Sequence, residues 1–159
     1  MTAILGVDCG LSGAWALLDD HGLVAIGDMP HADGAVSAHL LVTDLHVAAL
    51  RHLGVRVVER AAVVEIAGAM PGQGVSSTWK FARATGVVEG VLAGLGWPMH
   101  TVTPARWKRD LGLSKDKGAS RAMAARLWPD RAEWFARVKD DGRAEAALIA
   151  WWWRKEVGK

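Results

Sequence analysis

Two short apolar runs each contain a single acid near their C-terminal end, and this pattern limits what the chain can fold into. The run Ile4–Cys9 contains Asp8, and the run Ala61–Ile66 contains Glu65. Short apolar runs with glycines close by are typical of strands buried inside a sheet. An ionised carboxylate in such a strand is costly to bury unless it is paired or binds a cation. Each acid therefore predicts either a basic partner or a metal ligand.

The order of the other apolar segments predicts a mixed sheet with helices packed on it. Two further runs, Trp15–Leu18 and Leu23–Ile26, are separated by a turn signal and predict a three-stranded meander with the first run. The sequence further predicts strands over 61–66 and 98–102, and helices over 35–53, 76–95, 104–111, 119–128 and 141–155. This order predicts an α/β fold with a five-stranded mixed sheet flanked by helices. A chain of 159 residues fits a single domain, which we expect to span residues 1–159.

The last predicted helix begins with three acids, Asp140, Asp141 and Glu145. Acids are favoured at a helix N-terminus, which accounts for one of them. Asp141 and Glu145 are four residues apart and lie on one helix face. Joined by Asp8 and Glu65, they would form a carboxylate cluster that suits Mg²⁺ or Mn²⁺. Two such ions about 3.5–4 Å apart would activate water for phosphodiester cleavage.

Charge is distributed unevenly along the chain. Residues 1–78 hold 3 Lys/Arg and 8 Asp/Glu, a net charge of −5, whereas residues 79–159 hold 16 and 9, a net charge of +7. The split predicts a polyanionic partner bound by the C-terminal half, although a solvated surface would have the same composition. The basic candidates for contact with such a partner are Lys80, Arg83, Arg106, Lys108, Arg109, Lys115, Lys117 and Arg121.

A glycine-rich segment, residues 68–74, precedes the basic half. Its glycines permit close approach of the backbone to a sugar-phosphate chain, and Met70 and Gln73 would then contact DNA. The alternative is a plain connection between strand and helix.

Several segments, in order and at family spacing, resemble the RuvC Holliday junction resolvases. Residues 4–13 (ILGVDCGLSG) resemble the first strand of the RNase H-like superfamily. The others are 63–66 (VVEI), 70–90 (MPGQGVSSTWKFARATGVVEG), 102–108 (VTPARWK) and 139–148 (KDDGRAEAAL). The similarity is greatest to the phage or prophage-type branch, and it is weakest between residues 28 and 59.

This resemblance implies an RNase H-like fold and a crossover junction endodeoxyribonuclease, a hydrolase that cleaves four-way DNA junctions. It implies that Asp8, Glu65, Asp141 and Glu145 hold two Mg²⁺ or Mn²⁺ ions, and that Lys108 and Lys117 contact the phosphate. Cellular RuvC enzymes carry two aspartates three residues apart in the last helix. Here the spacing is four and the second acid is Glu, so Asp140 remains an alternative to Asp141.

The cellular enzymes also carry an aromatic residue shortly after the second acid, where this chain has Gly68. The residue that opens the junction must therefore differ. Met70 and Trp79 are the candidates, with Trp79 expected in the core.

A homodimer is expected, because a junction has two equivalent strands to cut and one carboxylate cluster cuts one strand. The predicted interface is the helix from Ser77 to Leu95, through Val87, Val88, Val91 and Leu95. The alternative is that these residues pack on the sheet and that another surface dimerises.

The expected location is the cytoplasm of a bacterial or phage-infected cell. No stretch reaches the roughly 18 uncharged apolar residues of a membrane span, and the N-terminus lacks the features of a signal peptide. The single cysteine, Cys9, excludes an internal disulfide.

Three other functions are compatible with parts of the sequence. Residues 8–13 (DCGLSG) are also similar to the phosphate loop of sugar kinases and actin-like ATPases, but those folds need two such domains and a second phosphate motif. A related RNase H-like protein processes RNA, so the choice between four-way DNA and structured RNA is open. A junction-binding protein without cleavage would not need all four acids.

Overall fold

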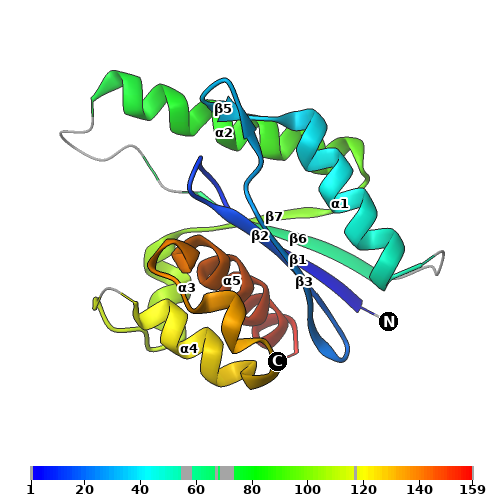
Figure 1. Cartoon of the computed structure of the whole chain (residues 1–159), viewed down its shortest axis with the longest axis vertical. Coiled ribbons are helices and arrows are strands. Elements are labelled where there is room, and N and C mark those ends of the chain that lie inside the picture. The colour runs from blue at the N-terminus through cyan, green and yellow to red at the C-terminus, as the bar shows by residue number, and fades with distance from the viewer. Residues whose placement is uncertain (1, 55–58, 67, 69–73, 117, 159) are drawn as a thin grey trace.

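A five-stranded sheet forms the centre of the molecule, with helices on both faces (Figure 1). The computed structural model describes residues 2–54, 59–66, 68, 74–116 and 118–158. The strands of this sheet are β1 (Thr2–Asp8), β2 (Ala14–Asp19), β3 (Gly22–Asp28), β6 (Glu59–Glu65) and β7 (Met99–Val102). The predicted α/β class, with a mixed five-stranded sheet, is confirmed.

Within the sheet the strands follow the order β3-β2-β1-β6-β7. β1, β2 and β3 form the predicted antiparallel meander, whereas β6 and β7 run parallel to β1. Because β1, β6 and β7 are parallel, their carboxyl ends lie at one edge of the sheet. Figure 1 shows α2 beginning on this side, and α3 and the first turns of α5 also lie there.

The helices form two layers. α1 (Ala38–His52) and α2 (Val75–Gly94) cover one face of the sheet. α3 (Pro104–Asp110), α4 (Ala119–Leu127) and α5 (Asp141–Val157) cover the other, together with two 3₁₀ helices, η1 (Pro129–Phe135) and η2 (Val138–Asp140). The 3₁₀ helices are absent from the sequence prediction.

Strand alternation sorts the side chains between these layers. Leu5 and Val7 of β1 pack with α1 and α2, whereas Ile4 packs with α5. In β6, Val64 belongs to the first core and Val63 to the second. The same parity places Asp8 and Glu65 on the face covered by α5.

Two helix starts differ from the prediction. Residues 35–36 form β5 (Ala35–Val36), which pairs with β4 (His31–Ala32), so α1 begins at Ala38 and not at residue 35. Ser37 caps α1 by accepting a hydrogen bond from the Leu40 amide at 3.4 Å. α2 begins at Val75 with Gly74 as its N-cap and has no side-chain cap hydrogen bond.

Two of the four residues predicted for the dimer interface on α2 are unavailable to a partner. Val88 and Val91 are buried in the core between α2 and the sheet, and Val87 and Leu95 pack against that core. Val88 and Val91 therefore belong to the core, and a dimer interface on the rest of α2 stays a prediction.

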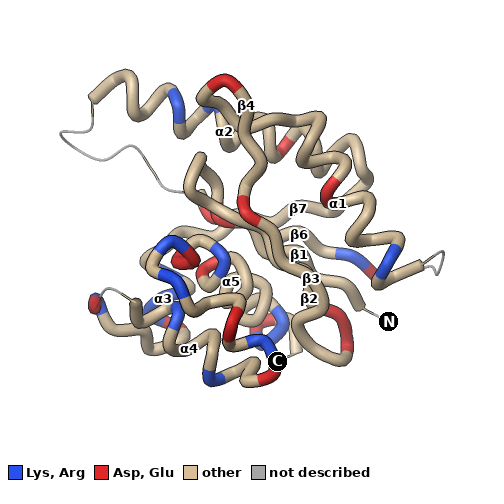
Figure 2. The backbone as a smooth tube through the Cα atoms, in the orientation of Figure 1, with Lys and Arg blue, Asp and Glu red and all other residues tan. Residues whose placement is uncertain are grey.

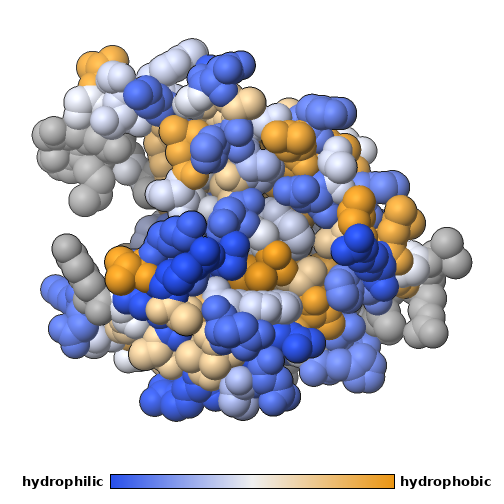
Figure 3. Space-filling view, in the orientation of Figure 1, coloured by the Kyte–Doolittle hydropathy of each residue, from blue (hydrophilic) through white to orange (hydrophobic). Residues whose placement is uncertain are grey.

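Trp79 is also placed differently from the prediction. Its side chain is 67% exposed, as α2 extends beyond the sheet at its N-terminal end. Hydrophobic atoms are visible at this outer end of α2 in Figure 3, where Val75 is 86% exposed.

Among the residues that the structure describes, no helix combines the length and apolarity needed to cross a membrane. Cys9 is buried and unpaired.

Candidate active site

The two strand acids lie side by side. Asp8 and Glu65 are the last residues of β1 and β6 and are register partners in this parallel pair. Their shared parity directs both side chains toward α5. The apolar runs that predicted two buried strands therefore also bring these two carboxylates together.

α5 approaches β1 unusually closely, because glycine leaves room for its backbone. A Cβ built at Gly6 would come within 2.1 Å of the Ala146 carbonyl oxygen and 3.0 Å of the Ala150 Cβ. At the start of the helix, a Cβ on Gly142 would lie 2.6 Å from the Ser12 carbonyl oxygen. This contact presses the first turns of α5, including Glu145, against the end of β1.

Three carboxylates meet as a result. Asp8, Glu65 and Glu145 each offer an oxygen atom, and these atoms all lie within 4.8 Å of one another. Burial raises the pKa of Asp8 well above its usual value, and the charges of Glu65 and Glu145 raise it further. Burial likewise raises the pKa of Glu65. A half-buried set of hard oxygen donors held against mutual repulsion is the donor chemistry that a divalent cation requires.

Three side chains donate hydrogen bonds to this cluster. The Trp107 indole Nε1 donates to Glu65 Oε2 at 2.6 Å, and the Lys108 Nζ donates to Glu145 Oε1 at 2.7 Å. Ser120 Oγ donates to the same Glu145 oxygen at 3.2 Å. Lys108 was predicted from the sequence, whereas Trp107 and Ser120 were missed. The one sequence feature that could have predicted Trp107 as a site residue is its position next to Lys108.

Asp141 lies outside the cluster of three. Its carboxylate accepts a hydrogen bond from Arg121 Nε at 2.6 Å, and its side chain is 50% exposed. Asp141 lies one helical turn before Glu145, and both residues line one hollow in the surface. Of the four predicted ligands, the structure brings three together and places the fourth beside them.

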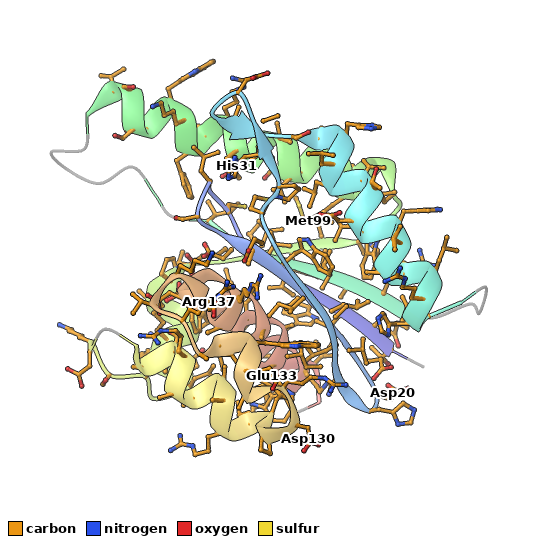
Figure 4. The ribbon with its side chains drawn as sticks, viewed as in Figure 1. Asp20, His31, Met99, Asp130, Glu133 and Arg137 are labelled. Atoms are coloured by element: carbon orange, nitrogen blue, oxygen red, sulfur yellow. The ribbon has the colours of Figure 1, made fainter. Side chains whose placement is uncertain are left out.

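Asp140 is 1% exposed and is held away from the cluster by its own partners. Its carboxylate accepts hydrogen bonds from the backbone amide of Arg137 at 2.9 Å and from that guanidinium at 2.8 Å. Burial would raise the pKa of Asp140, but these bonds hold it below the usual value. Arg137 lies beside the first turn of α5 (Figure 4), where the pair joins η2 to α5.

A hollow of about 700 Å³ opens next to the cluster. Glu145 and Asp141 line it, and Lys108, Arg109, Lys115 and Ser120 lie around them. Figure 2 shows Lys and Arg gathered near the acids between α3 and α5, and Figure 3 shows the strongly hydrophilic surface over the same region.

The other predicted DNA contacts lie at varied distances from this hollow. Lys80 and Arg83 are exposed on α2. Arg106 faces the other way, toward Glu156 and the Trp152 ring. Met70, Gln73 and Lys117 lie outside the described residues.

A comparison with protein-family models finds no match. One relative is the chloroplastic Holliday junction resolvase MOC1 of Chlamydomonas reinhardtii, which is 38% identical over 91 residues. The match covers 56% of this chain and 10% of that protein, so the chain spans about a tenth of the relative's length.

Solved structures match over almost the whole chain. RuvC of Thermus thermophilus, bound to a Holliday junction substrate, superposes with a TM-score of 0.65 at 16% identity, covering 98% of this chain and 96% of its own. The fowlpox virus Holliday junction resolvase has a TM-score of 0.55 at 12% identity, covering 98% of this chain and 99% of its own. The yeast mitochondrial Holliday junction resolvase has a TM-score of 0.52 at 15% identity, covering 94% of this chain and 76% of its own. The chain therefore has the RNase H-like fold of RuvC, as the sequence resemblance implied.

Proposed function

We propose that this protein is a metal-dependent, structure-selective endonuclease that resolves four-way DNA junctions by paired phosphodiester cleavage. The observation that carries the proposal is the meeting of Asp8, Glu65 and Glu145 within 4.8 Å at the end of an RNase H-like sheet. The match to a named Holliday junction resolvase at 38% identity adds independent support. Residues 1–159 are proposed to form one nuclease domain of the phage or prophage-type branch.

Asp8, Glu65 and Glu145 would hold Mg²⁺ or Mn²⁺, and we propose two ions per site. The donor set fits, because all three side chains offer hard carboxylate oxygens, and burial together with the neighbouring carboxylate charges raises the pKa of Asp8 and Glu65. When bound, such ions supply an activated water and neutralise the leaving oxygen. Asp141 is proposed as the fourth ligand, which requires Arg121 to release it.

Basic side chains around the cluster would contact the phosphate. Lys108 is proposed to contact the phosphate together with Lys117, while Ser120 orients Glu145. The hollow beside the cluster carries Lys108, Arg109 and Lys115 and would accept the sugar-phosphate backbone. Neutralising these basic residues should make the slope of the logarithm of the binding constant against the logarithm of the salt concentration less steep. The slope should change by up to about one per lost phosphate contact.

Trp79 is proposed as the residue that opens the junction. Its ring is largely exposed at the outer end of α2, and the next residue along the helix is the exposed Lys80. Exposed aromatic side chains beside positive charge stack on unpaired bases.

The protein is proposed to act as a homodimer on branched DNA. Two clusters related by a twofold axis would match the two equivalent strands of a junction. Since Val88 and Val91 are buried within the chain, the interface would use other residues. A cytoplasmic location is part of the proposal; the relative is chloroplastic by name.

The test is one gel with a synthetic four-way junction, a linear duplex, a flap and a structured RNA, each with Mg²⁺, Mn²⁺ or EDTA. The expected result is paired, symmetric nicks in the junction alone, in either metal, which Asp8→Asn, Glu65→Gln and Glu145→Gln each abolish while junction binding stays within a few fold. Cleavage of the RNA in preference to the junction would replace this function with RNA processing.

A further inference from the structure

α3 contacts two of the three carboxylates through neighbouring residues. β7 ends at Val102, the register partner of Glu65, and α3 begins at Pro104. The chain therefore enters this helix next to Glu65. Trp107 then reaches Glu65, and Lys108 reaches Glu145.

The contact between Trp107 and Glu65 is short and closed to solvent. The Trp107 side chain is fully buried, and Glu65 is 8% exposed. The indole Nε1 donates to Glu65 Oε2 at 2.6 Å. The Lys108 ammonium lies over the Trp107 ring, 5.1 Å from the ring centre. The indole thus contacts one carboxylate of the cluster and also the cation that binds another.

We propose that Trp107 is a positioning residue whose indole N–H fixes the Glu65 carboxylate for the divalent cation of the proposed function, on which this inference rests. A glutamate side chain has three rotatable bonds, and repulsion from Asp8 and Glu145 would drive its carboxylate out of the cluster. The rigid indole, anchored in the core on α3, holds Oε2 in place. The carboxylate keeps its remaining lone pairs for the cation.

Side chains that hydrogen-bond to a metal ligand influence metal affinity, because they determine where the ligand lies before the metal binds. A purely structural tryptophan would instead affect stability and leave metal affinity unchanged. The two roles are separable, since phenylalanine retains most of the aromatic packing but lacks the N–H.

The test is calorimetric titration of Mn²⁺ into Trp107→Phe without DNA, alongside the metal dependence of junction cleavage. Trp107→Phe is expected to weaken Mn²⁺ binding by about 10-fold, at the low end of the effect of losing such a partner. The Mn²⁺ concentration for half-maximal cleavage should rise by the same factor, with cleavage recovering at saturating Mn²⁺. If Trp107→Phe fails to fold, 3-benzothienylalanine at position 107 keeps the shape of the indole and replaces its N–H by sulfur.

The matched control is Trp152→Phe, which removes the indole hydrogen bond from Trp152 to Asp110 at the end of α3. This variant disturbs the same helix without touching Glu65, and its Mn²⁺ affinity is expected to equal that of the wild type. Equal Mn²⁺ affinity of Trp107→Phe and the wild type would overturn the role of Trp107 and leave the proposed nuclease standing. Absence of Mn²⁺ binding by the wild type would overturn both.

Discussion

Replacing Asp8 by asparagine should stabilise the metal-free protein while abolishing the proposed cleavage activity. Three carboxylates lie within 4.8 Å of one another, and two of the three repulsive pairs involve Asp8. The amide keeps the shape of the side chain and removes its charge. Stability and the proposed activity should therefore change in opposite directions at this position.

The size of the effect follows from Coulomb's law. Two unit charges 4.8 Å apart repel by about 3.5 kcal/mol at an effective dielectric constant of about 20. The attraction of Asp8 to Lys108 opposes the repulsion of these two pairs. We therefore expect Asp8→Asn to raise the free energy of unfolding by about 1–3 kcal/mol at pH 8 in EDTA.

The pH dependence has a definite sign. Burial and neighbouring acids raise the folded-state pKa of Asp8 and Glu65, so the folded protein keeps protons that the unfolded chain has released. The free energy of unfolding should then fall as the pH rises above the unfolded-state values of about 4 and through the raised folded-state values. Asp8→Asn should remove most of this decline, and saturating Mg²⁺ should remove it from the wild type.

Urea denaturation in EDTA between pH 5 and 9, followed by circular dichroism, measures both effects. Asp28→Asn is the control and should lower the free energy of unfolding where Asp8→Asn raises it. The Arg143 hydrogen bond favours the charged Asp28 carboxylate and lowers its pKa. That pair is exposed, so its loss should cost no more than about 1 kcal/mol. An Asp8→Asn variant less stable than the wild type at pH 8 would refute the repulsive cluster.

Four further substitutions test separate parts of the account. Gly6→Ala should lower the free energy of unfolding by about 1–3 kcal/mol and weaken Mn²⁺ binding, because the added Cβ forces α5 away from β1. Urea denaturation measures the stability and calorimetry the Mn²⁺ affinity, and unchanged Mn²⁺ binding would contradict this prediction. Asp140→Asn should lower the free energy of unfolding by about 1–3 kcal/mol through its lost charged hydrogen bonds, whereas Asp141→Asn should leave stability nearly unchanged and impair cleavage. A greater loss of cleavage in Asp140→Asn than in Asp141→Asn would make Asp140 the ligand. Trp79→Ala should weaken binding to the junction by about 1–3 kcal/mol with melting temperature preserved, and equal affinity in a gel-shift assay would remove Trp79 from the DNA surface.

Much of the fold was predictable from local sequence pattern. Apolar runs located all five strands of the main sheet, because buried strands must be apolar. The small hairpin at residues 31–36 and η1 were missed, since short elements carry too little periodic signal. Trp79, Val88 and Val91 were misjudged, because helical spacing gives the faces of a helix but not how far it extends beyond the sheet.

The site was predictable only in part. Asp8 and Glu65 stood out because a charge inside an apolar run needs an explanation. Glu145 followed from its helical spacing and the family resemblance. The separation of Asp141 from the cluster depends on Arg121, which approaches from α4, and the role of Ser120 depends on the same packing. Such contacts join residues about 20 or more positions apart and leave no trace in local pattern.

The most direct test of the central claim is an anomalous difference map from a crystal soaked in Mn²⁺. The account predicts a peak at about 2.1 Å from carboxylate oxygens of Asp8, Glu65 and Glu145, with a second ion completing the site. Asp8→Asn crystals treated in the same way should lose it. A wild-type map with no peak among these three side chains, at Mn²⁺ concentrations that support junction cleavage, would contradict the account.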